Sequence, residues 1–541
     1  MKKITALLLA LLVVLGCGSR QRTSLGSEQT ETEIAAPAPS VAQYATTPPE
    51  GAPITGGLHS DEVQAGIAAA GQARGADLHG DPRLATLAEW ISERLSPAGD
   101  PPPSEVIDFF AWNLGLTDPT PHVMVLGLPE RADIRENVRS STDQFLARQG
   151  YTHWGATVVP RAGVWLIVVT LSWRHLELDP IARTMPAGTP IRVHGRLAEG
   201  YSNPTVVAQS PNGETIRFPA GAGPDFDVRV PTDTGTGAYR VEVLARGPHG
   251  ESVLMNAPVY VGAEPPRTIR LDRPQETAGV QDVATVRAQL LQYLNRARNE
   301  VGLPALQEDP QLDAIASGHT RDMIDHDFVG HTSPTTGSAA DRVRTAGVQS
   351  GLVLENIGRG YSASEIHRGL LDSPGHRANL VNPHATHVGI GVIAEQENGR
   401  SAFLVTQVFI RVAESIDTAA APQTLLGHIN RARTARSAQE MAIDPNLQAA
   451  AQEAAEAFFT EPTSTQQDTV DRASASLRRF GIQYRRIGGV MAIVTTLDEA
   501  QQLEPALDDT VRLCGIGVAQ GTRPDTGPNA IAVVIVLGWE R

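Results

Sequence analysis

The chain of 541 residues has little cysteine, almost no lysine and no long apolar stretch beyond its first residues. Cys17 and Cys514 are its only cysteines, which excludes an internal framework of several disulfide bonds, so stability must come from packed cores. Lys2 and Lys3 are its only lysines, so arginine supplies every other fixed positive side-chain charge. After Leu15 no segment is long and apolar enough to predict a helix that crosses a membrane.

Acidic residues outnumber basic ones, and the formal net charge is −15. The sequence has no basic stripe with interleaved aromatic residues, so we expect no nucleic-acid partner. The length leaves room for several domains of ordinary size.

The first residues are typical of an export signal. Two lysines precede an apolar run, residues 4–15, that is short for a bilayer span. The sequence Val-Leu-Gly-Cys ending at Cys17 resembles a bacterial lipobox, which predicts a lipoprotein signal peptide over residues 1–16 and a lipid on Cys17. Gly18 favours sorting to the outer membrane of a two-membraned bacterium, on its periplasmic or surface face; the alternative is an ordinary signal peptide and secretion. Residues 17–57 are polar and Pro-rich, and they predict a disordered tether.

An internal repeat follows. Asp81, Asp309 and Asp444 each begin an Asp-Pro-x-Leu sequence ahead of a helix-like stretch. Aspartate suits the N-cap because its carboxylate accepts a free backbone N–H, and proline suits the first helical position because no N–H is needed there. The second and third copies also share an Asn-Arg-Ala-Arg sequence, at residues 295–298 and 430–433. We therefore expect three related units that start helices in the same way.

Each unit ends in two strand-like runs: residues 154–159 and 164–171, residues 388–392 and 403–408, and residues 514–518 and 531–537. Helices followed by hairpin strands predict an α+β layered fold. Between the first and second units, residues 186–264 change character. Apolar residues alternate there with polar ones, as at Phe226, Val228 and Val230, which predicts an all-β sandwich of immunoglobulin type.

Two histidine-bearing runs carry the chemistry. Residues 328–334 read Phe-Val-Gly-His-Thr-Ser-Pro, and residues 373–380 read Ser-Pro-Gly-His-Arg-Ala-Asn-Leu. Between them residues 354–358 read Leu-Glu-Asn-Ile-Gly. Histidines and a glutamate beside turn-forming residues indicate a polar cleft rather than a core.

At these motifs, over about residues 282–413, the chain resembles the CAP superfamily of cysteine-rich secretory, venom-antigen, pathogenesis-related and bacterial secreted proteins. The resemblance implies an α-β-α sandwich with a groove lined by two histidines and two glutamates, which are here His331, Glu355, Glu365 and His376. Leu354 stands where the family usually has glycine, and Leu370 where tryptophan is common. These departures bear on the shape of the groove.

Two imidazoles and two carboxylates suit a divalent cation such as zinc, calcium or magnesium. A metal-bound water beside Glu355 or Glu365 as base would give hydrolase chemistry, although no HExxH run is present. Each residue also has a local alternative. Glu365 follows Ser362 by three residues and suits a capping box, His376 suits a cap, and His331 suits a hydrogen bond within its own turn. The neighbouring His319, His326, His384 and His387 are interpreted as structural or peripheral.

The outer units are expected to lack the site. No histidine follows His428, and in the first unit residues 111–115 align with 354–358, which puts Trp112 at the Glu355 position. The predicted order is a degenerate CAP-like domain at 58–180, the β-sandwich at 186–264, an intact CAP domain at 280–414 and a second degenerate copy at 424–541.

Three functions remain open from the sequence. The first is a non-enzymatic cell-envelope protein that binds an unknown lipid, peptide or envelope ligand, with a divalent cation in the groove. The second is a metal-assisted, peptidase-like hydrolase, for which no catalytic residues are assigned because Ser333 near His331 has no identifiable third triad member. The third is an adhesion or scaffold protein with a vestigial site. Cys514 is expected to be a buried, inert thiol because it lies in an apolar strand.

Overall fold

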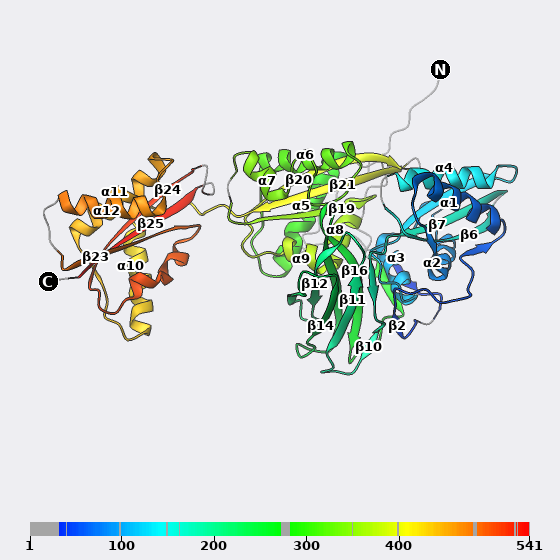
Figure 1. Cartoon of the computed structure of the whole chain (residues 1–541), viewed down its shortest axis with the longest axis horizontal. Coiled ribbons are helices and arrows are strands. Elements are labelled where there is room, and N and C mark those ends of the chain that lie inside the picture. Colours follow the sequence, from blue (N-terminus) through cyan, green and yellow to red (C-terminus); the bar gives the residue numbers. More distant parts are fainter. Residues whose placement is uncertain are drawn as a thin grey trace, which may run out of the picture.

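The computed structural model describes residues 32–38, 40–96, 99–147, 150–161, 163–271, 282–348, 350–397, 400–479, 484–523, 526 and 529–539. The predicted signal peptide and the lipidation site at Cys17 lie outside the described residues. Figure 1 shows an N-terminal unit, a β-sandwich and a central unit packed together, and a C-terminal unit set apart from them. None of the helices in the described ranges has the length and apolar character needed to cross a membrane.

The three mixed units share one sheet topology. In each, a two-residue strand runs parallel to the first strand of a long antiparallel hairpin, and a fourth strand pairs antiparallel with the second. In that order the strands are β4 (His79–Gly80), β6 (His153–Arg161), β7 (Val164–Ser172) and β5 (His122–Pro129); β18 (Gln307–Glu308), β20 (His387–Glu397), β21 (Arg400–Ile410) and β19 (Val353–Gly360); and β22 (Ala442–Ile443), β24 (Leu513–Gly521), β25 (Ala530–Trp539) and β23 (Arg486–Val494).

The repeated Asp-Pro sequence starts a helix in all three units, as predicted. These helices are α2 (Pro82–Ser92), α6 (Pro310–Asp325) and α11 (Pro445–Thr460). The carboxylate of Asp81 accepts one backbone N–H at the helix start, and those of Asp309 and Asp444 accept two each. Each helix lies close against a glycine of the hairpin, since a Cβ added at Gly389 would lie 2.1 Å from the Leu312 carbonyl carbon.

The shared Asn-Arg-Ala-Arg sequence lies on α5 (Val283–Glu300) and α10 (Ala421–Ala435). Arg298 and Arg433 are fully buried, and each guanidinium donates to four backbone carbonyls. Asn295 and Asn430 each exchange two hydrogen bonds with the backbone of a residue eleven positions later. The repeat therefore preserves a way of satisfying buried backbone groups rather than a chemical site.

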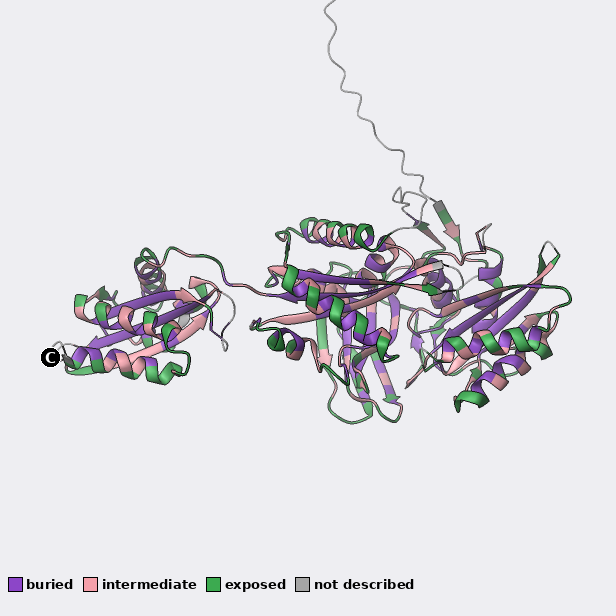
Figure 2. Ribbon diagram, turned by 90° about the horizontal axis from the view of Figure 1, so that it is seen from above, coloured by how far each residue is buried: buried purple, intermediate pink, exposed green. Residues whose placement is uncertain are grey.

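The central unit is an α-β-α sandwich, which confirms the expected fold. One face of its sheet packs against α5 and α8 (Ala363–Asp372), and the other against α6 and α7 (Ala339–Thr345). The short helix α9 (Pro374–Leu380) follows α8 directly. The C-terminal unit repeats the layers, with α10, η1 (Leu497–Gln502) and η2 (Glu504–Leu507) on one face and α11 and α12 (Gln466–Arg479) on the other. Figure 2 shows buried strands between helices whose outer faces are exposed.

The N-terminal unit adds α1 (Ser60–Arg74), α3 (Ser104–Asn113) and α4 (Ile134–Leu146). Between it and the central unit, two sheets enclose one core of apolar side chains. One sheet comprises β10 (Thr184–Met185), β16 (Gly250–Val261), β15 (Gly237–Gly247), β12 (Ser202–Gln209) and β13 (Thr215–Pro219). The other comprises β14 (Asp225–Val230), β11 (Ile191–Leu197) and β8 (Leu176–Leu178). This is a β-sandwich; its immunoglobulin type stays a prediction.

The prediction of a disordered tether over residues 17–57 is wrong for its described part. Residues 32–38 and 40–57 contribute β1 (Thr32–Ala35), β2 (Gln43–Tyr44) and β3 (Thr55–Gly57), which pair with β17 (Thr268–Leu271), β9 (Ile181–Ala182) and β6. Tyr44 is fully buried, and its hydroxyl donates to the carbonyl of Pro258 at 2.7 Å. The mean composition of the segment is polar, so it did not reveal that one large side chain, Tyr44, is buried. Nor could it reveal that short strands of the segment pair with the edges of strands elsewhere in the chain.

Residues 411–420 join the central and C-terminal units in an extended path (Figures 1 and 2). Arg411 pairs with Glu499, and the Glu414 N–H donates to the Thr495 carbonyl at 3.2 Å. The link is thus fastened to the C-terminal unit.

Candidate functional site

The first half of the predicted site is a buried charge cluster on Glu355, which lies on β19. Its Oε1 accepts a hydrogen bond from Nδ1 of His331 at 2.9 Å. Its Oε2 accepts one from the Arg342 guanidinium of α7 at 2.6 Å. Burial alone would raise the pKa of this carboxyl, but the His331 hydrogen bond and the neighbouring positive charges lower it overall. Glu355 is therefore ionised and held by donors on both oxygens.

His319 belongs to this cluster, so of its two interpretations, structural or peripheral, the structural one fits. Its side chain is buried on α6, with Nε2 2.9 Å from the Gly330 carbonyl and 3.8 Å from Oε1 of Glu355. The carbonyl acceptor requires the proton on Nε2. A signal was present in the sequence, because His319 follows the buried Leu312 by seven positions and Ala316 by three, on the helix face that meets the sheet.

The second half of the predicted site lies at Glu365 and His376. Oε2 of Glu365 accepts from the Tyr361 N–H at 2.8 Å, and the Glu365 N–H donates to Oγ of Ser362 at 3.2 Å. Ser362 is thus the N-cap of α8, which supplies one half of the predicted capping box, whereas the Glu365 carboxylate accepts from the N–H of Tyr361, one residue before the N-cap. Burial, with the charge of His331 as a smaller cause, lowers the pKa of His376 to about 3, so this imidazole is neutral at physiological pH.

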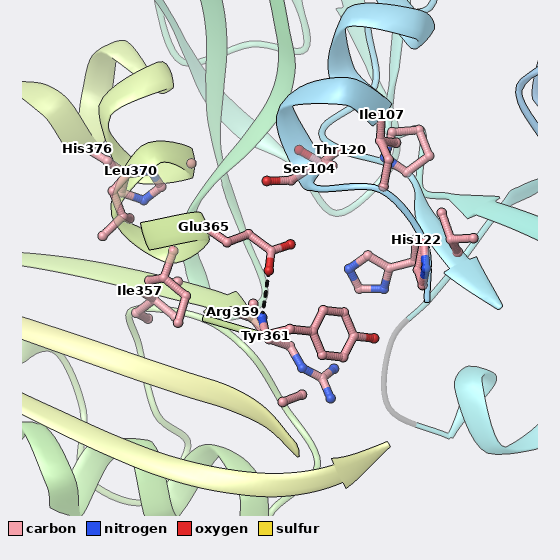
Figure 3. Close-up of a pocket in the computed structure, with 18 of the residues that line it drawn as sticks. Ser104, Ile107, Thr120, His122, Ile357, Arg359, Tyr361, Glu365, Leu370 and His376 are labelled. Atoms are coloured by element: carbon pink, nitrogen blue, oxygen red, sulfur yellow. Dashed lines mark hydrogen bonds between the residues drawn. The ribbon is translucent and has the colours of Figure 1, made fainter. Parts of the chain in front are cut away.

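A cavity of about 250 Å³ adjoins this second half. It lies between the central unit and the N-terminal unit, and Figure 3 shows Glu365 pointing across it. The labelled lining residues are Ser104, Ile107, Thr120, His122, Ile357, Arg359, Tyr361, Glu365, Leu370 and His376. His331 and Glu355 are not among the residues that line it. The four predicted residues are therefore divided between a charge cluster and a cavity, which are linked by a 6.4 Å ring approach of His331 and His376.

The four residues as placed do not fit a divalent cation. Of the residues that the structure describes, no three among His, Cys, Asp and Glu are grouped so that they could hold a metal ion. Both oxygens of Glu355 are already engaged, and the Arg342 guanidinium 2.6 Å from Oε2 would repel a second cation. The divalent-cation hypothesis stays a prediction that this arrangement does not support.

The β-sandwich contacts both histidine motifs. Beside His331, the Thr332 N–H donates to the His249 carbonyl at 2.9 Å, at the turn between β15 and β16. Ahead of His376, the fully buried carboxyl of Glu242 accepts from Oγ of Ser373 at 2.7 Å and from the Gly375 N–H at 2.9 Å. The sandwich therefore fixes the segments that carry both histidines.

The alignment that placed Trp112 at the Glu355 position is wrong. Trp112 lies on α3, and its indole N–H donates to the Asn256 carbonyl of the β-sandwich at 2.9 Å. Sheet register identifies the true counterparts of Glu355 as Val123 on β5 and Gly489 on β23. The error arose because a helix end followed by glycine has the same residue types as the strand sequence. Neither outer unit has a carboxylate at this position.

Residues 291–409 match the family model described as CAP, the cysteine-rich secretory protein family, so this segment is a CAP domain. The uncharacterized protein YkwD of Bacillus subtilis (strain 168) is 32% identical over 135 residues, which cover 25% of this chain and 50% of that protein. The uncharacterized membrane protein YlbC of the same organism is 35% identical over 109 residues, which cover 20% of this chain and 32% of that protein. The chain thus spans half the length of the first relative and about a third of the second.

Among solved structures, the chain is similar to an extracellular protein containing an SCP domain from Bacillus anthracis str. Ames. The sequence identity is 19% and the TM-score 0.22, with 50% of this chain and 93% of that chain covered.

Proposed function

We propose that this chain, whose residues 291–409 form a CAP domain, is a lipid-anchored extracytoplasmic binding protein that takes a small ligand into the cavity beside Glu365 and His376. The observation that carries the proposal is the cavity itself. It combines apolar walls with a few polar groups, which is the usual character of small-molecule sites. Its volume of about 250 Å³ suits a small molecule rather than a folded partner.

Binding is better supported than hydrolysis. A general base works best when its pKa lies near the working pH. The pKa of His376 is lowered to about 3 by burial, and Glu355 is already engaged by His331 and Arg342. Neither group is poised to activate a water or a nucleophile. Glu365, the other candidate base, lines the cavity with Oε2 held by the Tyr361 N–H, and no other group of the predicted four accompanies it there except the neutral His376. We therefore infer that the site holds its ligand without transforming it.

The lipid anchor rests on the lipobox-like sequence ending at Cys17. Expression in a two-membraned bacterium fed a labelled fatty acid would test it. Wild-type protein is expected to carry label and to sediment with outer membranes. A Cys17→Ser variant is expected to lose the label and become soluble. Label that persists in the variant would contradict the anchor while leaving the binding site untouched.

Native mass spectrometry of the mature chain tests binding and turnover together. Three probes represent the candidate ligand classes: a short-chain phosphatidylcholine, a hydrophobic tripeptide and a peptidoglycan fragment. Gly369 lines the cavity with open space where a Cβ would stand, so Gly369→Leu is expected to obstruct the site, and Gly369→Ala serves as the matched control. An adduct of unchanged mass that Gly369→Leu removes supports a binding protein. A cleaved probe would favour the hydrolase, and no adduct with any class would favour a scaffold with a vestigial site.

A further inference from the structure

Two domains build the cavity. From the central unit, α8 presents Glu365 and Leu370, and β19 presents Ile357 and Arg359. The opposite wall comes from the N-terminal unit, where α3 presents Ser104 and Ile107 and the chain around the start of β5 presents Thr120 and His122. Figure 3 shows Ser104 and His122 across the cavity from Glu365. The N-terminal unit, which has Val123 at the position of Glu355, thus contributes to the cavity of its neighbour.

This second wall is held in place by contacts outside the cavity. Glu105 of α3 pairs with Arg368 of α8. The Trp112 indole binds the β-sandwich backbone at Asn256, whose amide donates in turn to the Asp372 carbonyl at 3.3 Å. Within the wall, the ring of His122 contacts the Tyr151 hydroxyl and lies 5.5 Å from the Trp173 ring. The N-terminal unit is therefore fixed against the CAP domain and the β-sandwich by contacts that do not involve the cavity.

The cavity lining carries one positively and one negatively charged side chain. Arg359 and Glu365 are the lining residues with full charges, one of each sign. Burial, and secondarily the charge of Arg359, lowers the pKa of His122 to about 3, so this imidazole, like that of His376, is neutral at physiological pH. Arg359 is held by Glu395 at 3.2 Å, and Glu365 by the Tyr361 N–H. An anionic ligand would meet the Glu365 carboxylate, and a cationic one would meet the Arg359 guanidinium.

We propose that the N-terminal unit is the second wall of the binding site and that the cavity selects a small, net-neutral ligand with hydrogen-bonding ends and an apolar body. This inference rests on the proposed binding function and deepens it. Apolar contact comes from Ile107, Ile357 and Leu370, and the hydroxyls of Ser104 and Thr120 add polar groups from the far wall. Because the lining carries both signs of charge, the cavity accepts a zwitterion or an uncharged molecule. It disfavours a ligand with a net positive or a net negative charge.

Four leucine derivatives of similar size test the selection on the mature full-length chain. N-acetyl-L-leucinamide is uncharged, L-leucine is a zwitterion, N-acetyl-L-leucine is an anion and L-leucinamide is a cation. Dissociation constants from saturation-transfer NMR titrations are expected to be about tenfold lower for the net-neutral pair than for the charged pair, a difference of about 1.4 kcal/mol. Glu365→Gln removes the anionic side of the balance, so the anion is expected to gain on the uncharged amide.

The wall is tested by substitutions on its two sides. Ser104→Leu on the N-terminal unit and Gly369→Leu on the CAP domain are each expected to weaken the net-neutral ligands by about tenfold or more. The matched controls are Ser104→Thr, which keeps the hydroxyl, and Gly369→Ala, and each is expected to change binding by about twofold or less. Loss of binding in Gly369→Leu alone would refute the second wall and leave the proposed function standing. Equal binding of all four compounds, or of none, would refute the charge selection. The lipid, tripeptide and peptidoglycan probes decide the proposed function separately.

Discussion

Glu242 should act as a pH-dependent contact between the β-sandwich and the helix that carries His376. The side chain lies on β15 with no exposed surface, between the Ser373 hydroxyl and the Gly375 N–H. Burial raises the pKa of this carboxyl from 4.5 to about 7, against the opposing effect of the two hydrogen bonds and of Arg217. Glu251 adds a smaller effect in the same direction as burial. Glu242→Gln is the natural perturbation, because an amide accepts from Gly375, donates to the serine oxygen and never ionises.

The magnitude follows from linkage. Below about pH 4.5 the carboxyl is protonated whether the interface is closed or open, so the closed form has its full stability. As pH rises from 4.5 towards 7, Glu242 ionises first in the open form, in which α9 has separated from the β-sandwich and the carboxyl meets water. The free energy that keeps the contact closed therefore decreases until the pH passes about 7, the pKa of Glu242 in the closed form. A pKa raised from 4.5 to about 7 corresponds to a loss of about 3 kcal/mol, at about 1.4 kcal/mol for each tenfold change. Glu242→Gln should abolish this loss.

Hydrogen exchange of the α9 amides, corrected for intrinsic rates, measures the opening free energy directly. His376 lies on the same helix, and its lowered pKa makes the opening free energy rise as pH increases towards 6.5 in both proteins. The contribution of Glu242 is therefore the wild-type value minus the Glu242→Gln value, and this difference should fall by about 3 kcal/mol between about pH 4.5 and about pH 8. Glu251→Gln is the matched control, since Glu251 is exposed on the neighbouring strand and pairs with Arg217. If the Glu242→Gln protein has the same pH profile as the wild type, Glu242 is not the titrating group of this contact.

Four further results are expected. Glu355→Gln should lower stability by about 3–5 kcal/mol in thermal unfolding, because the buried Arg342 loses its paired charge; an unchanged midpoint would contradict the charge cluster. Arg433→Met should cost at least about 3 kcal/mol in urea unfolding because four carbonyls lose their donor, whereas Arg431→Met on the exposed face should cost less than about 0.5 kcal/mol. Zinc, calcium or magnesium added after chelation should leave the unfolding midpoint unchanged, and a concentration-dependent rise would restore the metal hypothesis. Cys514 should resist a thiol reagent until the chain unfolds, because burial raises the pKa of its thiol to about 12; rapid labelling of the native protein would disprove this.

Local signals in the sequence predicted local structure well. Asp309 and Asp444 are N-caps because a carboxylate beside proline has few better positions, and the apolar hairpins fold as predicted because their strands are buried between helices. The Asn-Arg-Ala-Arg repeat was visible, but its meaning was not. Arg298 and Arg433 donate to backbone carbonyls rather than to a carboxylate. The sequence does not show which loops place those carbonyls beside the arginine, so the burial of these two residues could not be predicted.

The candidate site was predictable in its members and not in its arrangement. The motif residues His331 and Glu355 do meet, yet Arg342, which occupies the other carboxylate oxygen, has no signal beyond its place on a short helix. The cavity at Glu365 depends on Ser104 and His122, which come from a unit more than two hundred residues away in the sequence. Contacts between domains depend on docking, and no periodicity within either segment encodes it.

A crystal structure of the mature chain with saturating N-acetyl-L-leucinamide tests the central claim most directly. Ligand density is expected in the cavity between α8 and the start of β5, with polar atoms towards Glu365 and Ser104 and the leucine side chain towards Ile107, Ile357 and Leu370. Density at another surface, or an empty cavity at saturation, would contradict a ligand site shared by the two domains.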